Sequence, residues 1–225
     1  HISVGYSEQT EISRLFEIKS NKIKVIPNGV HVEQFQNTAT NELSKQFFGI
    51  PHQSFVFGTM ARISQPKGLE YLIRGFKEHV KKHPDSFLFI AGDSDDKLNY
   101  VRNIHEMGEH PRILFLDHQS DVTKLFSALD VYVSSSLWEG LPLTVIEAMV
   151  SGKPCALSDI PAHKELVVNV QNAIFFKSRD SQAICDALDN VRAQSQSELL
   201  RYGEELKTMG SEKYDIKKTF EKYSS

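Results

Sequence analysis

Two carboxylates, Glu139 and Glu147, mark the stretch of this chain that is best suited to chemistry. Glu147 lies in the apolar run 143–150, which predicts a buried helix, and an unpartnered carboxylate is costly in such a place. Glu139 lies in the turn before that helix. Because a helix start offers free backbone N–H groups to anions, the site predicts a ligand that carries both phosphates and hydroxyls. A second interpretation stays open from spacing alone, in which protein groups hydrogen-bond Glu147.

The residues around the two glutamates predict a strand, a helix and another strand. Residues 131–133 are β-branched or aromatic, as in a buried strand. Pro142 stands at the expected first helical position, where its fixed φ is favourable, and Gly152 stands at the expected helix end. Residues 154–157 predict the second strand. In such a βαβ unit Glu139 follows the carboxyl end of a parallel strand, which is where ligands bind.

Two cations, Arg62 and Lys67, lie in the loop between a predicted strand at 55–61 and a predicted helix at 69–82. Arginine can bind a diphosphate through two parallel hydrogen bonds, and lysine can bind it as a point charge. Considered without the rest of the chain, two loop cations are more often simply solvated. Their combination with the two glutamates is what favours a diphosphate site.

The run EGLPLTVIE, from Glu139 to Glu147, resembles the donor-site signature of family 4 retaining glycosyltransferases, which have the GT-B fold. Ala148-Met149, the run 151–154 and Glu165 match the family pattern as well. The resemblance implies an α/β, Rossmann-like doubly wound parallel sheet that forms the C-terminal half of such an enzyme. It also implies catalytic roles for Arg62, Lys67 and Glu139.

The resemblance implies a donor site built from strand ends, the turn and the helix start. Its expected members are Gly58, Arg62, Lys67, His118, Glu139, Gly140, Leu141, Leu143, Thr144 and Glu147. Glu147 would bind the ribose hydroxyls and His118 would stack on the base, while Glu139 would either grip the sugar or lie near its anomeric carbon. No metal and no cofactor is expected beyond the nucleotide-sugar substrate, by default a UDP-sugar. For Glu165 a helix cap or an ion pair is as compatible with the sequence as a site role.

Residues 26–30, reading IPNGV, resemble the interdomain linker of this family, although His31 replaces the usual aspartate. The expected division is a tail of a missing N-terminal domain at 1–20, the nucleotide-sugar domain at 21–210 and a helix that crosses back at 211–225. A glycan or lipid-linked acceptor would then bind through the missing domain. The fragment alone would bind donor with little turnover.

Composition bounds the remaining possibilities. With 225 residues, 40% of them hydrophobic and 24% charged, the chain is typical of a soluble globular protein. A net charge of -3 gives no indication of a nucleic-acid partner. Cys155 and Cys185 fit neither a disulfide framework nor metal-ligand spacing, and no apolar run is long enough to span a membrane. The expected location is the cytoplasm, with a peripheral position at the inner face of the membrane open for the full-length protein.

Other motifs in the sequence suggest different classes of site or protein. Asp93-Ser94-Asp95 spells the metal-nucleotide motif of the unrelated GT-A enzymes, but a GT-A fold does not explain Arg62 and Lys67. His79 and His83 are spaced like metal ligands, but the sequence shows no third ligand, so helix-surface histidines are expected. A nucleotide-sugar 2-epimerase of the same fold and a non-catalytic GT-B-like binding module remain alternatives. An epimerase would release an altered nucleotide sugar without any acceptor.

Overall fold

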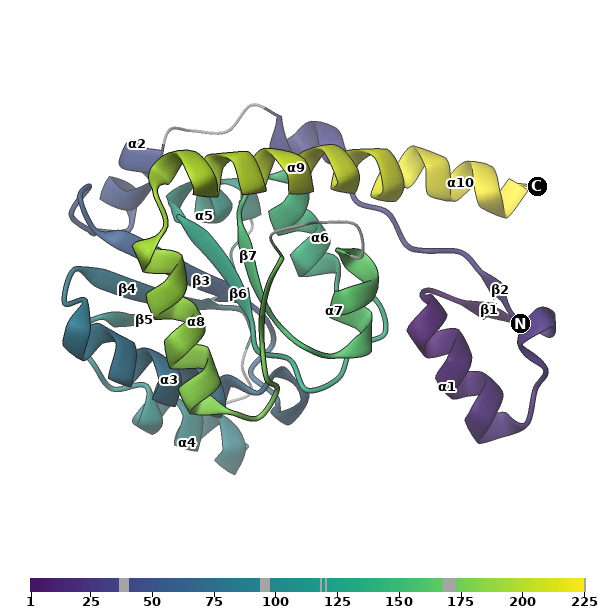
Figure 1. Ribbon diagram of the computed structural model, residues 1–225, viewed down its shortest axis with the longest axis horizontal. Helices are drawn as coiled ribbons and strands as arrows, with labels where there is room; N and C mark the ends of the chain where they lie inside the picture. The colour runs from purple at the N-terminus through teal and green to yellow at the C-terminus, as the bar shows by residue number, and fades with distance from the viewer. Residues whose placement is uncertain (37–40, 94–97, 118, 120, 168–172, 225) are drawn as a thin grey trace.

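A six-stranded parallel sheet forms the centre of the protein (Figure 1). The computed structural model describes residues 1–36, 41–93, 98–117, 119, 121–167 and 173–224. The strands follow the order β5-β4-β3-β6-β7-β8. The chain therefore enters this sheet near its middle, at β3, adds β4 and β5 on one side and then β6, β7 and β8 on the other. Their bounds are β3 Phe55–Met60, β4 Ser86–Ala91, β5 Ile113–Leu116, β6 Val131–Ser134, β7 Cys155–Ser158 and β8 Ile174–Phe176. This is the predicted doubly wound α/β sheet.

Helices cover both faces of the sheet, because its strands carry apolar side chains on both sides. On one face Phe57 and Leu88 pack with α3 (Leu69–Lys82), α4 (Asn99–Met107) and α8 (Ser181–Ala193). On the other, Val56 and Tyr132 pack with α5 (Val122–Ala128), α6 (Leu143–Val150) and α9 (Gln196–Tyr214). Alternate residues of one strand therefore enter opposite cores, as the period of two requires.

Most predicted elements are confirmed, with differences at their ends. The bounds of α3 agree with the sequence prediction, whereas β3 ends at Met60, one residue before the predicted end of the strand. Helix α6 begins at Leu143, so Pro142 is its N-cap and not its first helical residue. Two helices were not predicted, α4 and the short α7 (Pro161–Leu166). Helix α2 spans Asn41–Phe47; threonine is a favoured N-cap residue, but Thr40, which precedes the helix, falls outside the described residues.

The first 25 residues form a small unit beside the sheet domain (Figure 1). Strand β1 (Ile2–Ser3) pairs in parallel with β2 (Lys24–Val25), and α1 (Tyr6–Phe16) lies between them in the chain. The pairing joins residues on both sides of the division expected at residue 20. That division, and the one at residue 210, stay predictions.

The chain enters and leaves the sheet domain at one point. Val30 forms an isolated parallel bridge with Asp215, the residue between α9 and α10 (Ile216–Ser224). The Val30 N–H donates to the Tyr214 carbonyl at 2.8 Å, and the Ile216 N–H donates to the Val30 carbonyl at 3.0 Å. From there α10 runs along the linker toward the N-terminal unit (Figure 1). Among the described helices, none is both long enough and apolar enough to cross a membrane.

Candidate functional site

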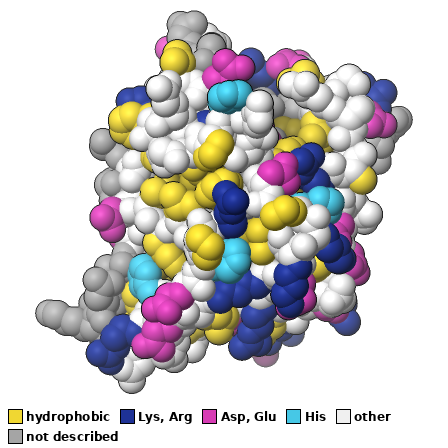
Figure 2. All heavy atoms as spheres, turned by 90° about the vertical axis from the view of Figure 1, so that its left-hand side faces the viewer, with side chains coloured by type: hydrophobic (Ala, Val, Ile, Leu, Met, Phe, Trp, Pro, Cys, Tyr) yellow, Lys and Arg dark blue, Asp and Glu magenta, His cyan; other side chains and the backbone are white. Residues whose placement is uncertain are grey.

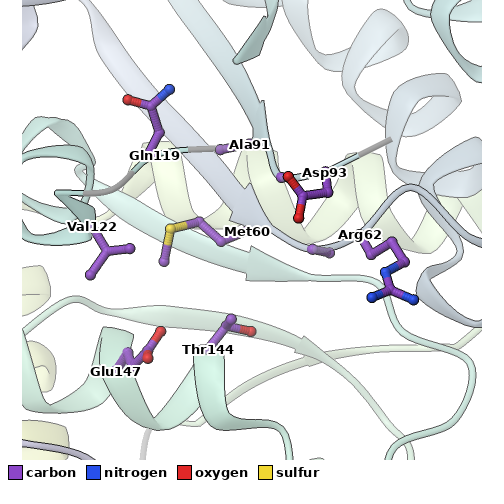
Figure 3. Close-up of a pocket in the computed structure, with 10 residues that line it drawn as sticks. Met60, Arg62, Ala91, Asp93, Gln119, Val122, Thr144 and Glu147 are labelled. Atoms are coloured by element: carbon purple, nitrogen blue, oxygen red, sulfur yellow. The ribbon is translucent and has the colours of Figure 1, made fainter. Parts of the chain in front are cut away.

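A pocket of about 280 Å³ lies at the carboxyl ends of β3 and β4, opposite the start of α6. Figure 3 shows Thr144 and Glu147 on α6, with Met60 and Arg62 across the pocket from them. Its lining is Met60, Ala61, Arg62, Ala91, Gly92, Asp93, Gln119, Val122, Thr144 and Glu147. Three residues predicted for the donor site, Arg62, Thr144 and Glu147, are therefore brought together by elements far apart in the sequence.

Glu147 is half-buried in the pocket wall. Its burial raises the pKa of the carboxyl to about 7. No described residue hydrogen-bonds or ion-pairs with its side chain, so the interpretation in which protein groups satisfy Glu147 is not met within the described residues. A carboxyl in this state is a ready acceptor for ligand hydroxyls, because binding would supply the missing partner.

The start of α6 has free backbone N–H groups. Pro142 has no N–H to offer, and the N–H groups of Leu143 and Thr144 have no acceptor among the described residues. Tyr132 donates its hydroxyl to Thr144 Oγ1 at 2.9 Å, which fixes the threonine side chain. Burial raises the pKa of Tyr132, so this phenol keeps its proton. The free N–H groups and the helix dipole favour negative charge at this point.

Lys67 and Glu139 form an ion pair, and neither residue belongs to the lining of this pocket. Lys67 Nζ lies 2.6 Å from Glu139 Oε1, with the two side chains 25% and 14% exposed. Lys67 ends the 3-10 turn Gln65–Lys67, and Gly68 follows it at φ +60°. A Cβ on Gly68 would lie 2.4 Å from the Ser135 carbonyl oxygen, so only glycine lets the turn pack here. The predicted catalytic lysine and glutamate are thus in direct contact.

The other predicted donor residues have different surroundings. Gly58 lies within β3, where Leu129 fills the space of its missing side chain, so the structure gives it a packing role. Gly140 lies against Val4 and Glu8 of the N-terminal unit. Leu141 packs on the core. His118 falls outside the described residues, and its neighbour Gln119 lines the pocket.

The three serines at the end of β6 were not predicted as site residues. Ser135 Oγ donates to the Lys67 carbonyl at 2.9 Å, and Ser136 Oγ donates to Glu139 Oε1 at 2.7 Å. All three are buried, with 3–5% exposure. Three consecutive hydroxyls that end a buried strand were the sequence signal for this arrangement, since buried hydroxyls need partners.

Glu165 has a clear role in the structure. Its carboxylate accepts the N–H groups of Tyr6 and Ser7, both at 2.9 Å. Among the interpretations open from the sequence, the helix cap is the one observed, and the helix capped is α1 of the N-terminal unit. Trp138 Nε1 adds a second contact by donating to Glu11 Oε2 at 3.1 Å. The turn that carries Glu139 is therefore attached to α1 from two sides.

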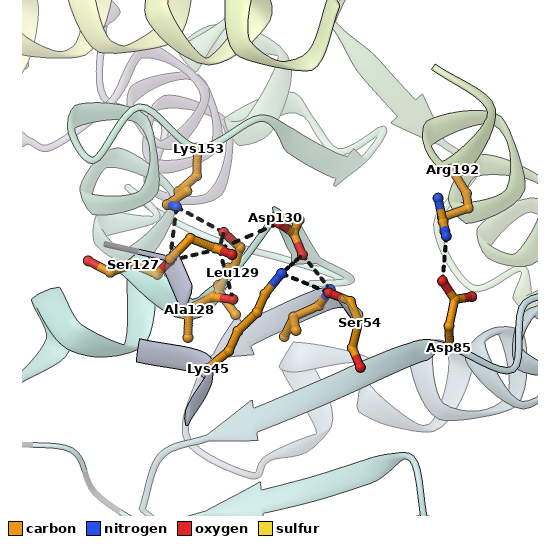
Figure 4. A network of polar contacts seen from close by, with 11 residues as sticks. Lys45, Ser54, Asp85, Ser127, Ala128, Leu129, Asp130, Lys153 and Arg192 are labelled. Carbon is orange, nitrogen blue, oxygen red and sulfur yellow. Dashed lines mark hydrogen bonds and ion pairs between the residues drawn. The ribbon is translucent and has the colours of Figure 1, made fainter. Parts of the chain in front are cut away.

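The opposite end of the sheet has a larger cavity, of about 520 Å³, but a different character. Basic and histidine side chains lie among hydrophobic ones on the face in Figure 2. Within the cavity Lys45 Nζ lies 2.7 Å from Asp130 Oδ2, which also accepts the Val56 N–H (Figure 4). Lys153 donates to the Leu129 carbonyl at 2.8 Å, and burial lowers its pKa to about 8. Protein groups already satisfy these charges, so this cavity is the weaker candidate.

One cluster of His and Asp side chains corrects a sequence prediction. His79 is fully buried and not on the helix surface, and its Nδ1 lies 2.6 Å from Asp189 Oδ1. His83 lies 3.6 Å from the same oxygen, so Asp189 of α8 is the third residue that the sequence could not show. However, Lys82 Nζ lies 2.6 Å from the other oxygen of Asp189. The carboxylate therefore already has partners without a metal.

Comparisons with known proteins agree with the fold and the motif. The family model "Glycosyl transferases group 1" matches residues 40–208. A UDP-Gal:alpha-D-GlcNAc-diphosphoundecaprenol alpha-1,3-galactosyltransferase of Escherichia coli is 34% identical over 177 residues, which are 76% of this chain and 45% of that protein. The chain spans about half the length, or less, of the curated relatives it matches first.

Two solved structures extend the comparison. The Anabaena protein HepE, in complex with UDP and glucose, superposes with a TM-score of 0.89 over 99% of this chain and 61% of that one, at 22% identity, which shows a shared fold. The C-terminal domain of a glycosyl transferase group 1 family protein from Francisella tularensis has a TM-score of 0.72 at 25% identity. That match covers 84% of this chain and the whole of that domain.

Proposed function

Because the chain belongs to the glycosyl transferases of group 1, we propose that it supplies the donor site of a retaining, nucleotide-sugar-dependent glycosyltransferase. The single observation that carries this proposal is Glu147, a half-buried carboxyl whose pKa is raised to about 7 and which lacks a partner among the described residues. Two ribose hydroxyls would donate to it. The nucleoside would then occupy the pocket between α6 and the ends of β3 and β4.

The diphosphate would lie between the cations and the start of α6. Arg62 lines the pocket, and the N–H groups of Leu143 and Thr144 are free to bind phosphate oxygens. Negative charge grows on the diphosphate as it leaves the sugar. Arg62, Lys67 and the two amides would therefore stabilise the transition state more than the bound donor, which is the condition for catalysis. No step in this scheme needs a metal or a further cofactor.

Glu139 would face the donor sugar, either as a hydrogen-bond acceptor for its hydroxyls or beside the anomeric carbon. The contacts from Lys67 and Ser136 to one oxygen, Oε1, support this placement, because no described residue bonds the other oxygen. Oε2 would thus be open to the sugar. Lys67 would divide its charge between Glu139 and the arriving diphosphate.

We propose a UDP-hexose as the donor and a glycan or lipid-linked saccharide as the acceptor. The name of the Escherichia coli relative contains a UDP-sugar and a lipid-linked acceptor, which supports this choice. The acceptor would bind through a second domain, and this chain alone would bind donor with little or no turnover. The sugar transfer would take place in the cytoplasm, with the full-length protein bound peripherally at the inner face of the membrane.

Calorimetric titration of the chain with UDP, GDP, ADP and CMP, without and with magnesium, tests the proposal. We expect one diphosphate to bind equally well without magnesium. Binding that requires the metal would contradict the metal-free scheme, and binding of none would contradict the donor site. A full-length protein that altered UDP-glucose without an acceptor would be an epimerase instead.

Arg62→Ala tests the place of the diphosphate. We expect the substitution to lower the affinity for UDP at least tenfold and the affinity for uridine less than twofold, because only UDP has phosphates that Arg62 could contact. Arg74→Ala, which removes an exposed arginine on α3, is the matched control and should leave both ligands unchanged. Equal losses of affinity for UDP and uridine would contradict the placement of Arg62 at the diphosphate.

A further inference from the structure

Behind Glu139 lies a buried polar cluster of Ser134, Ser136, Ser158 and His163, here called the serine–histidine cluster. His163 and Ser158 have no exposed surface, and Ser134 and Ser136 are 5% and 3% exposed. The scheme proposed above gives His163 no task. Buried polar groups of this kind are retained at a cost unless they are fully hydrogen-bonded, and fully bonded clusters hold one rigid arrangement.

The direction of the hydrogen bonds that His163 makes with the Ser158 carbonyl and with Ser134 follows from chemistry. His163 Nδ1 lies 2.9 Å from the Ser158 carbonyl, which can only accept, so Nδ1 carries the proton. In the neutral ring Nε2 then accepts, and Ser134 Oγ donates to it at 3.2 Å. Burial lowers the pKa of His163 to about 4, so the ring stays neutral near pH 7. One tautomer is therefore fixed.

The cluster leads to Glu139 along the turn that follows β6. Ser158 Oγ donates to the Ser136 carbonyl at 2.6 Å, and Ser136 Oγ donates to Glu139 Oε1 at 2.7 Å. Ser134, the last residue of β6, is held by His163. The His163 ring thus holds Ser134, the residue before the turn, and the turn carries the Glu139 carboxylate.

We propose that His163 is a positioning residue for Glu139, acting through its Nε2 contact with Ser134. The Nε2 atom of His163 accepts a hydrogen bond from the Ser134 hydroxyl. This contact fixes the direction in which the backbone leaves β6 and enters the turn that carries Glu139. Glu139 Oε1 then keeps its contacts with Lys67 and Ser136. The part of this inference that concerns donor sugars rests on the proposed function. The position of the carboxylate does not.

Two substitutions of His163 separate the two sides of the ring. His163→Gln places a side-chain oxygen near the position of Nε2 and can still accept from Ser134. His163→Asn places an amide N–H near the position of Nδ1 and can still donate to Ser158, but loses Ser134. Ser134→Ala removes the same contact from the other partner. His79→Asn is the matched control, because His79 is equally buried and lies in a cluster at the other end of the sheet.

The first readout is the ¹³C signal of the Glu139 carboxyl, assigned with Glu139→Gln and recorded for the chain without ligand. We expect His163→Asn and Ser134→Ala to shift this signal alike, the double variant to add nothing, and His163→Gln and His79→Asn to leave it in place. A signal that stays unmoved in His163→Asn and Ser134→Ala would overturn the proposal. Equal shifts in His163→Asn and His163→Gln would also overturn it, since they would indicate a merely structural role.

The second readout is the affinity of UDP-glucose and of UDP-galactose relative to UDP, measured by calorimetry. We expect His163→Asn to lower the preference for the better UDP-sugar over UDP about tenfold, which is the worth of one or two hydrogen bonds, with UDP itself unchanged. His163→Gln should recover most of the loss. If the unsubstituted chain binds none of the three, the proposed function fails, while the carboxyl signal still decides the role of His163.

Discussion

The two glutamates of the EGLPLTVIE run have opposite environments. Glu139 has an ion pair with Lys67 at 2.6 Å and a hydrogen bond from Ser136 at 2.7 Å. Glu147, eight positions later on α6, has no bonded partner among the described residues, and its pKa is raised to about 7 by burial. One carboxylate is held in place by the protein. The other has no bonded protein partner within the described residues.

The difference indicates two kinds of contribution to one site. A group that must act at a reacting atom gains from being fixed before the substrate arrives, because the cost of ordering it is met by folding. A group that binds a ligand gains from being unsatisfied before binding, because the ligand then relieves the cost of its burial. Four experiments would break or sharpen this comparison.

The largest effect is expected for Glu139→Gln in the full-length protein. Transfer should fall at least about 100-fold, near 3 kcal/mol of transition-state stabilisation, while UDP binding stays within about twofold. The transfer rate is measured as UDP release from UDP-galactose in the presence of a lipid-linked saccharide acceptor. UDP binding is measured by calorimetry. Glu78→Gln, on the exposed side of α3, is the control. Parallel losses of binding and transfer would remove the distinction between the two glutamates.

Glu147→Gln should show the reverse pattern in binding. UDP affinity should weaken about tenfold or more, because the ribose hydroxyls lose a charged acceptor. Calorimetry at pH 8 measures the change, again beside Glu78→Gln. An additional titration with 2′-deoxy-UDP sharpens the result, since the deoxy ligand should lose affinity for the unsubstituted chain and much less for the variant. Unchanged UDP affinity in Glu147→Gln would contradict the ribose assignment.

The pH dependence of uridine binding should follow Glu147. Uridine is the suitable ligand because the terminal phosphate of UDP itself titrates near pH 6. With a pKa of about 7 in the free protein, Glu147 is mostly ionised at pH 8 and mostly protonated at pH 6. Uridine affinity, followed by NMR titration, should fall about tenfold between these values. Glu147→Gln should give a flat profile, and an equally steep one would assign the dependence to another group.

The smallest effect is expected on stability, with opposite signs for the two residues. Because the folded-state pKa of Glu147 is raised, the native protein binds more protons than the unfolded chain between about pH 4.5 and 7, and the free energy of unfolding falls as pH rises through this window. Glu147→Gln should therefore raise Tm at pH 8 by about 2–4 °C for each kcal/mol relieved, and by nothing at pH 4. Glu139→Gln should lower Tm, since Lys67 loses its partner. Calorimetric scans of the unliganded chain decide both signs.

The sequence predicted the sheet and the position of α6 because these depend on local patterns. The predicted strands at 55–61 and 131–133 and the Pro142 and Gly152 signals suffice for that. It also predicted the meeting of Arg62, Thr144 and Glu147, because the carboxyl ends of parallel strands share one edge. The pairing of Lys67 with Glu139 could not be predicted, since it depends on the path of two loops that pack at Gly68.

Other residues escaped prediction for the same physical reason. The resemblance implies a donor-site place for Gly58, whereas in the structure Leu129 from a distant part of the chain fills the space beside it. His79 looked exposed, because its spacing gives no information on α8, which covers it. His163 stands in a helix too short to show a period, and its partners Ser134 and Ser158 come from two different strands. Contacts between elements are the part that a single sequence does not contain.

The sheet domain begins and ends at neighbouring residues, because Val30 is bridged to Asp215 through hydrogen bonds with Tyr214 and Ile216. A unit whose ends meet in this way can be exchanged as one cassette, and it also suits circular permutation, since a short loop would join the ends without strain. Consider a hybrid that carries residues 30–215 of this chain between the flanking segments of a relative. It would keep the close packing of Gly29 on Ile216 only if both positions were transferred as well. A side chain at position 29 would lie 2.5 Å from the Ile216 backbone. The sheet domain thus forms a separable part that recombination could exchange among relatives.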